Sequence, residues 1–465
     1  MKKEKKVVDF TNGPILGPMM KFMLPVLAAL AIQSLYGAVD LLIVGQFGEA
    51  LHVSGVAMGS QPVFSLTAIV TAIAMGTTIM LGQYIGEGKR KHAGDVIGTS
   101  IITFAVLAVI LTVILFTCAK PLLMLLQTPE EALAQGTIYV RICSIGMIFT
   151  VAYNIIGSVF RGIGDSKTPL ITVSIACIVN IAGDLLLVGV FGMAAAGAAI
   201  ATIFAQAVSV VVSLLIVKKR GLPFSFDKSN LKFQGAICKR IFRLGLPLAA
   251  QELVVTASFM ILAAVANTLG LIESAAVGVG GRLILFIMLV PSAFLQSLSA
   301  IVAHNVGARK LKRAKKALFH AIWTSLAFAT IMYFIAGLHG TWITRFFTTD
   351  PEVMEAAALY LRSYAIDTFL TSFLFCFIGY FNGCGRTGIT MIQGFLGVAI
   401  RVPVAFLMRS LPNTNLFFIG LATPISTVFQ IALCVIYFLV TNKKLKEQYD
   451  SEFNPELLKE IEIED

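Results

Sequence analysis

Long apolar runs recur along the whole chain, and they leave few folds open to it. Each run has about 20 residues, which is enough for a helix to cross the hydrocarbon core of a bilayer. Backbone polar groups must all be satisfied internally there, and a helix does so within one segment. Charged residues make up only 13% of the sequence, against about 25% in a soluble domain. The pattern therefore predicts an all-α integral membrane protein.

Twelve transmembrane helices are expected from these runs. The first run follows a basic start, but it is too long for a signal peptide and contains Pro25 and Asp40, so we interpret it as an uncleaved helix. Pro25 removes a backbone hydrogen bond and is expected to kink that helix. The expected spans are 22–46, 55–84, 94–117, 136–160, 168–191, 194–217, 244–267, 275–303, 317–338, 357–381, 389–408 and 416–440.

Basic residues are distributed unevenly between alternate loops. The chain has 36 Lys and Arg and a formal net charge of +11, a balance that could also indicate nucleic-acid binding. When the N-terminus is placed inside, only Lys120, Arg345 and Arg409 fall in outer loops. This asymmetry follows the positive-inside rule. It predicts that both termini lie in the cytoplasm, and we expect no nucleic-acid partner.

The two halves of the chain resemble each other at an offset of about 221 residues. Because each half has six spans, the halves are expected to be parallel repeats related by an axis along the membrane normal. This predicts two pseudo-symmetric six-helix lobes around a central cleft. The matching residues include Leu24-Pro25 with Leu246-Pro247, Gly86 with Gly307, Pro129-Glu130 with Pro351-Glu352, Tyr139 with Tyr360, and Gly162 with Gly383.

The repeat also predicts the division of the chain into lobes. We expect an N-lobe at residues 1–220 and a C-lobe at residues 244–442. The polar and basic stretch 221–243 is the longest expected cytoplasmic loop and joins the two lobes. Residues 443–465 are expected to form a cytoplasmic tail.

Polar side chains inside the spans gather in the N-terminal half. Asn180 and Asp184 are four residues apart and share one helix face. In the first span Gln33, Tyr36 and Asp40 also share a face. A carboxylate near the bilayer centre costs about 2.5–3.5 kcal/mol on insertion scales, so such a residue needs a partner or a functional role.

The C-terminal half lacks this set of polar residues. Asn180 corresponds to Arg401, which would repel a bound cation, and Asp184 corresponds to Ala405. Hard cations prefer oxygen ligands, and two carboxylates in a low-dielectric site cannot both stay ionised cheaply. We therefore predict a Na⁺ or proton site in the N-lobe between spans 1, 4, 5 and 6. The alternative is that these side chains only hydrogen-bond neighbouring helices together.

Two further carboxylates lie in the C-terminal spans. Glu252 and Asp367 could bind substrate, or they could pair with Arg282 or Arg401 as part of the scaffold. The sequence contains no phosphate-binding loop and no cluster of His and Cys. We therefore expect neither an enzyme nor a transition-metal site.

With these motifs the chain resembles the multidrug and toxic compound extrusion (MATE) transporters, and most closely their DinF-like branch. The resemblance rests on Pro25, the segment 82–89, Arg161-Gly162-Ile163-Gly164-Asp165 and the segment 197–202. It implies export of amphipathic, often cationic, organic compounds in exchange for Na⁺ or H⁺. It also implies a coupling site made of Asp40, Asn154, Asn180, Asp184 and Thr202.

The resulting hypothesis is a multidrug antiporter in a bacterial cytoplasmic membrane, acting as a monomer without a cofactor. The sequence does not choose between Na⁺ and H⁺ as the coupling ion. A lipid-linked oligosaccharide flippase and a single-metabolite exporter stay open as alternatives. Candidate residues of the substrate cavity are Gln33, Tyr36, Gln206, Glu252 and Asp367.

Overall fold

The structure is a computed structural model, and it describes residues 8–452 except 225 and 346. The basic residues at positions 1–7 and the end of the expected tail, 453–465, lie outside the described residues. In the described part, 11 helices are long and apolar enough to cross a membrane, and a bent helix pair makes a twelfth when it is counted as one span. The predicted all-α membrane fold is therefore confirmed.

The helices extend beyond the predicted apolar runs, because their polar ends continue past the hydrocarbon layer. Helix α7, for example, carries Lys218, Lys219 and Arg220 in its last turn, where cations complement the helix dipole, and it ends at Gly221 with a φ of 74°. The first half contains α1 (Leu16–Phe47), α2 (Ala50–Gly86), α3 (Arg90–Leu125), α4 (Glu130–Ile145), α5 (Met147–Gly162), α6 (Lys167–Asp184), the π-helical η1 (Leu185–Val190) and α7 (Ala194–Arg220).

The second half repeats this order of long helices. The predicted span 317–338 consists of α10 and a π-helical segment η3, and the last predicted span is divided between α14 and α15. The elements are η2 (Lys228–Asn230), α8 (Gly235–Asn267), α9 (Leu271–Gly307), α10 (Leu311–Tyr333), η3 (Phe334–Leu338), α11 (Gly340–Thr344), α12 (Pro351–Gly383), α13 (Thr387–Arg409), α14 (Leu416–Gly420) and α15 (Ala422–Glu452).

The run predicted as one span at 136–160 is bent. Helices α4 and α5 meet at Gly146 with an angle of 56° between them. A Cβ atom on Gly146 would collide with the side chain of Ile203 on α7. The glycine thus lets α7 approach the bend closely, as small residues do in membrane helix packing.

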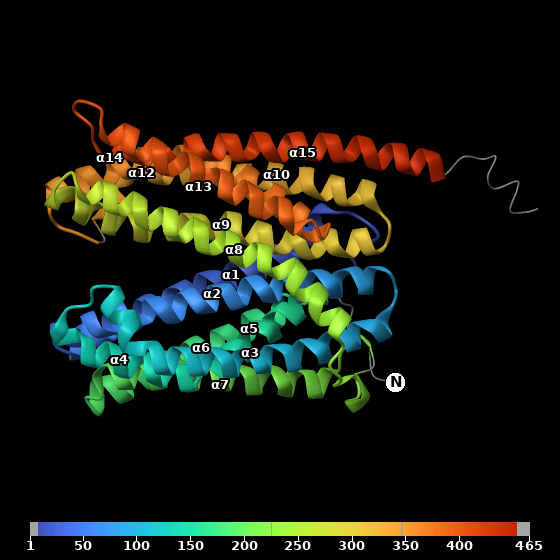
Figure 1. Ribbon diagram of the computed structural model, residues 1–465, viewed down its shortest axis with the longest axis horizontal. Coiled ribbons are helices and arrows are strands. Elements are labelled where there is room, and N and C mark those ends of the chain that lie inside the picture. The colour runs from blue at the N-terminus through green and yellow to red at the C-terminus, as the bar shows by residue number, and fades with distance from the viewer. Residues whose placement is uncertain (1–7, 225, 346, 453–465) are drawn as a thin grey trace, which may run out of the picture.

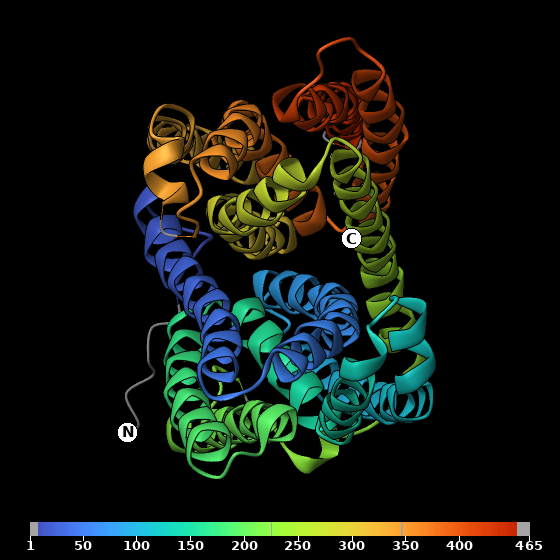
Figure 2. The same cartoon turned by 90° about the vertical axis from the view of Figure 1, so that its left-hand side faces the viewer.

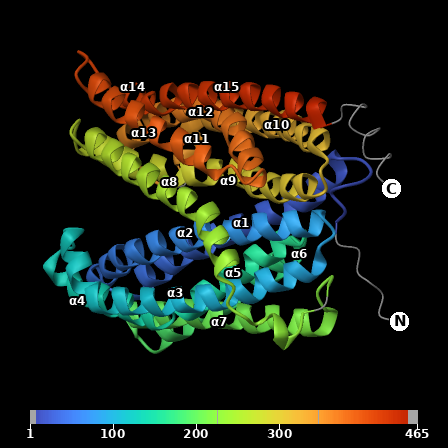
Figure 3. The same ribbon diagram turned by 45° about the vertical axis from the view of Figure 1, so that its right-hand side comes forward.

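The helices form two bundles, α1–α7 and α8–α15, that lie side by side (Figures 1 and 2). The first helix of each bundle crosses to the other. The start of α1 packs in the core of the second bundle, with Phe22 in one cluster with Phe294 and Phe377. The start of α8 packs on α2 and α3, where Ile241 lies in one cluster with Met80. Figure 3 shows α8 reaching across to the first bundle. This exchange ties the two bundles together.

Helices α2 and α9 cross at the end of the molecule that carries Lys89 and Arg309. A Cβ atom on Gly86 would collide with the carbonyl oxygen of His304, and one on Gly307 would collide with the carbonyl oxygen of Gln83. The Gln83 amide donates to the Gly383 carbonyl at 3.2 Å and accepts from Arg240 at 2.7 Å. The two bundles are therefore in close contact at this basic end.

Candidate functional site

A polar cluster in the first bundle brings together α1, α6 and α7. The Thr202 hydroxyl donates to Asp40 Oδ2 at 3.1 Å, and the Asn180 amide donates to the Thr202 hydroxyl at 3.5 Å. Asp184 completes the cluster, because its carboxyl neighbours that of Asp40. The exposed fractions of Asp40, Asn180 and Asp184 are 6%, 1% and 0%. The cluster is therefore enclosed by protein.

The local backbone explains why these four residues meet. Gly183 and Ala201 are small, and a Cβ atom on Gly183 would lie 3.0 Å from the Ala201 methyl group. Helices α6 and α7 can therefore approach closely at the level of Thr202. Asp184 is the last residue of α6, and the chain continues from it as the π-helix η1. Such π-helical segments are frequent at functional sites.

The cluster contains more buried oxygen atoms than donors. Asp40 Oδ1, Asn180 Oδ1 and both carboxyl oxygens of Asp184 have no hydrogen-bond donor from the protein. Buried polar atoms without partners are costly, and the oxygens here come from carboxylate, amide and hydroxyl groups. This arrangement can take up a proton or a hard cation such as Na⁺.

Asn154 is not joined to these four residues by any described hydrogen bond. Its carbonyl accepts from the Thr71 hydroxyl at 2.8 Å, and its amide donates to the Thr150 carbonyl at 2.8 Å. Asn154 instead lines a neighbouring cavity. Of the five residues predicted for the coupling site, the structure thus groups Asp40, Asn180, Asp184 and Thr202 and places Asn154 beside the cavity.

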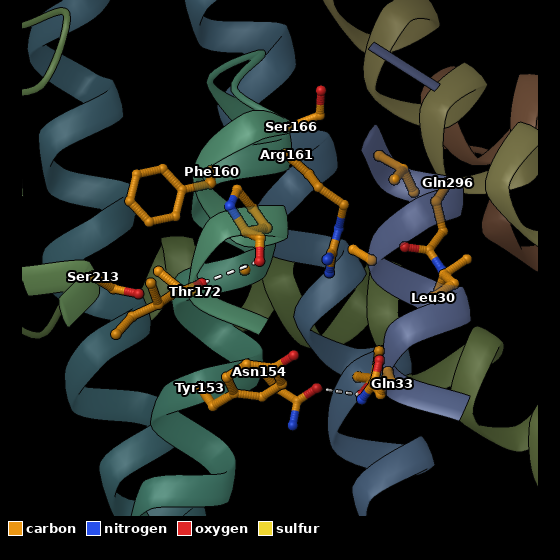
Figure 4. Close-up of a pocket in the computed structure, with 16 residues that line it drawn as sticks. Leu30, Gln33, Tyr153, Asn154, Phe160, Arg161, Ser166, Thr172, Ser213 and Gln296 are labelled. Carbon is orange, nitrogen blue, oxygen red and sulfur yellow. Dashed lines mark hydrogen bonds between the residues drawn. The ribbon is translucent and has the colours of Figure 1, made fainter. Parts of the chain in front are cut away.

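The cavity has a volume of about 100 Å³ and lies between α1, α2, α5, α6, α7 and α9 (Figure 4). Gln33, a candidate from the polar face of the first span, lines it. Val26 also lines it and directly follows Pro25, which lies inside α1. Because proline removes a backbone hydrogen bond, the wall of the cavity is formed by a weakened part of α1.

Tyr36 and Gln206, the other candidates from the first half, lie outside this lining. The Gln206 side chain accepts a hydrogen bond from the Thr150 hydroxyl at 2.5 Å. Tyr36 neighbours Gln206. These two residues therefore connect α1, α5 and α7 next to the cluster.

The C-terminal candidates are not paired in the way considered from the sequence. Asp367 on α12 accepts a hydrogen bond from Thr371 at 2.8 Å. Arg401 donates to Ser258 at 2.8 Å, and its guanidinium lies 4.3 Å from the centre of the Phe259 ring. Among the described residues neither Arg401 nor Arg282 forms a salt bridge with Glu252 or Asp367. The pairing that the sequence left open as one alternative is therefore not formed as a salt bridge between these described residues.

Sequence reasoning missed several residues of the cavity wall. Arg161 was used in the sequence analysis only as part of the motif 161–165. The equivalent residue in the second half is Asn382, so the difference in charge between the repeats was a signal that could have identified Arg161 as a site residue. No sequence pattern identified three other residues of the wall, Tyr153, Thr71 and Gln296. Gln296 comes from α9 of the other bundle, and only the packing of the two bundles brings it to this cavity.

The structure has two helical bundles with the same order of long helices, and a buried polar cluster lies in the first bundle. These features are typical of membrane transporters with internal repeats. The MatE family model matches residues 25–186 and 247–407, one segment in each half of the chain. The chain belongs to this family. It is therefore a MATE transporter and not an enzyme.

Similar proteins cover nearly the whole chain. "Probable multidrug resistance protein YpnP" of Bacillus subtilis (strain 168) is 26% identical over 93% of this chain and 97% of its own length. The "FAD transporter" of Shewanella oneidensis is 26% identical over 75% of this chain and 78% of its own length. A solved multidrug resistance MATE transporter in an outward-facing conformation has the same fold, with a TM-score of 0.89 at 20% identity. That match covers 96% of this chain and all of the other.

Proposed function

We propose that this protein exports amphipathic organic compounds in antiport with Na⁺ or H⁺, and that Asp40, Asn180, Asp184 and Thr202 form its coupling site. The observation that carries this proposal is the group of four buried oxygens without donors in that cluster. The relatives with names that indicate multidrug resistance support export of varied compounds.

The geometry suggests how ion and substrate binding could be coupled through one helix. Asp40 lies on α1, and Val26, Ala29, Leu30 and Gln33 of the same helix line the cavity. Occupation of the cluster neutralises Asp40 and draws α1 towards α6 and α7. Because α1 contains Pro25 between its first turns and the cavity wall, the helix can bend there. An ion and a substrate then compete through the position of α1.

The charge distribution supports an orientation in the bacterial cytoplasmic membrane. We place the basic end, with Lys89 and Arg309, in the cytoplasm together with both termini. The close contact of α2 with α9 at this end then makes the present state closed to the cytoplasm. Alternating access requires that this contact separates during each cycle. We propose that a monomer carries out the cycle.

The test is drug efflux from proteoliposomes under an imposed Na⁺ gradient, and separately under an imposed pH gradient. One of the two gradients is expected to drive efflux by the wild type. We expect Asp40→Asn and Asp184→Asn to abolish efflux under that gradient. Glu131→Gln, which changes an exposed carboxylate of the same bundle outside the cluster, serves as the control and is expected to keep efflux within about twofold. Full gradient-driven efflux by both cluster variants would disprove the coupling assignment.

A second candidate function is export of a single metabolite. It is favoured by the similarity to the transporter named for FAD and by the presence of a cation, Arg161, in the cavity wall. Drug-susceptibility profiles of cells that overproduce the protein would separate the two functions, because broad resistance supports multidrug export. The flippase alternative called for a basic cavity formed by Arg401 and Arg282, and neither residue lines the described cavity.

A further inference from the structure

We propose that the cavity beside Pro25 binds the acidic group of its substrates, a carboxylate or a phosphate, and that Arg161 is the residue that selects this group. The proposal rests on the proposed function in one respect, namely that the cavity belongs to the substrate pathway. It adds a chemical class to the substrates: amphipathic compounds that carry an acidic group.

Arg161 stands at the end of α5 and extends into the cavity (Figure 4). Its Nη2 donates to the Ser158 hydroxyl at 2.9 Å, whereas its buried Nε has no hydrogen-bond partner. A guanidinium group has five N–H donors. Several of these donors therefore stay available for a ligand.

Among the described residues, no carboxylate forms an ion pair with Arg161. None of the residues that line the cavity is Asp or Glu, and no described acidic group lies within salt-bridge distance of the guanidinium. Asp165 is the nearest acid along the chain, but its carboxyl accepts from the Lys167 and Thr168 amides at 3.0 and 3.1 Å and from the Thr168 hydroxyl at 2.6 Å. The charge of the cavity wall is therefore positive.

The rest of the wall fits an anionic group attached to an apolar body. Neutral side chains that can donate hydrogen bonds, such as Gln33 and Gln296, line the cavity together with the apolar Leu30 and Phe160. A Cβ atom on Gly157 would lie 3.4 Å from Arg161 Nη1, so this glycine leaves room beside the guanidinium. Arg161 is partly buried and has no counter-charge in the cavity wall, and a bound anion would supply that charge.

The geometry of the guanidinium group explains the expected selectivity. Arginine binds carboxylates and phosphates through two parallel N–H···O bonds, which are stronger than bonds between neutral groups. The same charge repels a ligand that carries only a cation. A cavity of about 100 Å³ accommodates the acidic head group, and bending of α1 at Pro25 would provide space for a larger apolar body.

The test is binding of two dyes to the purified full-length protein in nanodiscs, measured by fluorescence polarisation. Rhodamine 110 carries a free carboxylate, and rhodamine 123 is its methyl ester, so the pair differs only at the acidic group. We expect the wild type to bind rhodamine 110 about tenfold more tightly. Arg161→Gln is expected to lose about tenfold for rhodamine 110 and less than about twofold for rhodamine 123, whereas Arg161→Lys retains part of the preference.

Arg141→Gln is the matched control, because it removes an exposed arginine of the same bundle that lies over the Phe116 ring. It should leave the affinity for both dyes unchanged. Retained binding of rhodamine 123 shows that the Arg161→Gln protein is folded. Equal affinities of the wild type for the two dyes, an unchanged preference in Arg161→Gln, or binding of neither dye would overturn the proposal. The assay uses no ion gradient, so the selectivity can be shown even if the antiport proposal fails.

Discussion

At the scale of residues, the first bundle combines a buried cluster of polar groups with a cavity whose wall holds a cation. Asp40 and Asp184 supply two carboxyl groups to the polar cluster, and Arg161 supplies positive charge to the cavity wall. Both sites include α1, which provides Asp40 to the first and Gln33 to the second. A shift of this helix would therefore alter both sites together.

The cluster yields a prediction about stability. A ligand that binds only the native state raises its stability, so added Na⁺ at constant pH, or added protons at constant Na⁺, should raise the melting temperature of the wild type. Asp184→Asn removes one of the two facing carboxyls, and we expect it to abolish most of this response. Thermal unfolding in detergent at a series of Na⁺ concentrations and pH values measures the effect. Glu131→Gln, which changes an exposed carboxyl of the same bundle, is the control. An unchanged response in Asp184→Asn would contradict the prediction.

At the scale of elements, the segment before α1 is held on the second bundle. Phe10 has an exposed fraction of 3%, and its ring packs edge-on against Phe22 and against His304, each at 5.2 Å. Arg313 donates to the carbonyl oxygens of Phe10, Asn12 and Gly13 at 2.7 to 3.0 Å. The segment therefore contacts the residue whose carbonyl meets Gly86 at the α2–α9 crossing.

A carboxylate also stabilises this segment. Burial would raise the pKa of Asp9, but hydrogen bonds from Asn12 and Thr11 outweigh it and lower the pKa to about 2. A carboxyl with a lowered pKa contributes stability at pH values above its unfolded pKa of about 3.9. That contribution is lost only as the pH falls towards 2. The segment should therefore keep these contacts throughout the physiological pH range.

Arg313→Ala tests the attachment of this segment. The substitution removes charged hydrogen bonds to four backbone carbonyls, including that of Pro14 at 3.4 Å, and we expect it to lower the free energy of unfolding by about 1–3 kcal/mol. Hydrogen exchange of residues 8–15 should become faster, while exchange in the middle of α2 should stay the same. Lys312→Ala changes the exposed neighbouring residue and is the control. Equal exchange rates in Arg313→Ala and the wild type would show that the segment is held by other contacts.

At the scale of the whole molecule, the repeat produces a nearly two-fold crossing of α2 and α9. Gly86 meets the carbonyl of His304, and Gly307 meets the carbonyl of Gln83. Gly86 and Gly307, like Gln83 and His304, are repeat equivalents at the offset of about 221 residues. Each glycine permits a backbone approach that any other residue would prevent. The closed basic end thus depends on both halves of the duplication.

Gly86→Ala is therefore expected to hold the basic end open. A methyl group there collides with a backbone carbonyl, so the bundles must separate. The distance between spin labels at positions 89 and 309, measured by pulsed electron resonance after replacement of the seven native cysteines, should lengthen. Gly278→Ala on α9 is the control, because a Cβ atom there meets nothing within 4 Å. Identical distance distributions for Gly86→Ala and the control would refute this role of the crossing.

Hydropathy and helical spacing were sufficient to predict the spans and most of the polar cluster. Each span is encoded by local composition, since a lipid-facing helix must be apolar along its whole length. Asn180 and Asp184 share a face because of helix geometry alone. The repeat position of Asp184 in the second half holds Ala405, which has no carboxyl, and this difference indicated that the face has a role in the first half only. The bend at Gly146 was not predicted from hydropathy, and the close approach of the Ile203 side chain to this glycine is a contact with another helix.

The amino-acid sequence alone is enough to predict the helical membrane fold, its duplication and the residues proposed to bind a cation. These predictions depend on local composition and on periods of a few residues. The packing of the helices was needed to show that α1 and α8 exchange bundles, that Gln296 joins the wall of a cavity in the other bundle, and that no described carboxylate forms an ion pair with Arg161. Such contacts join residues more than a hundred positions apart, and in lipid they depend on how closely helices fit together rather than on hydrophobicity.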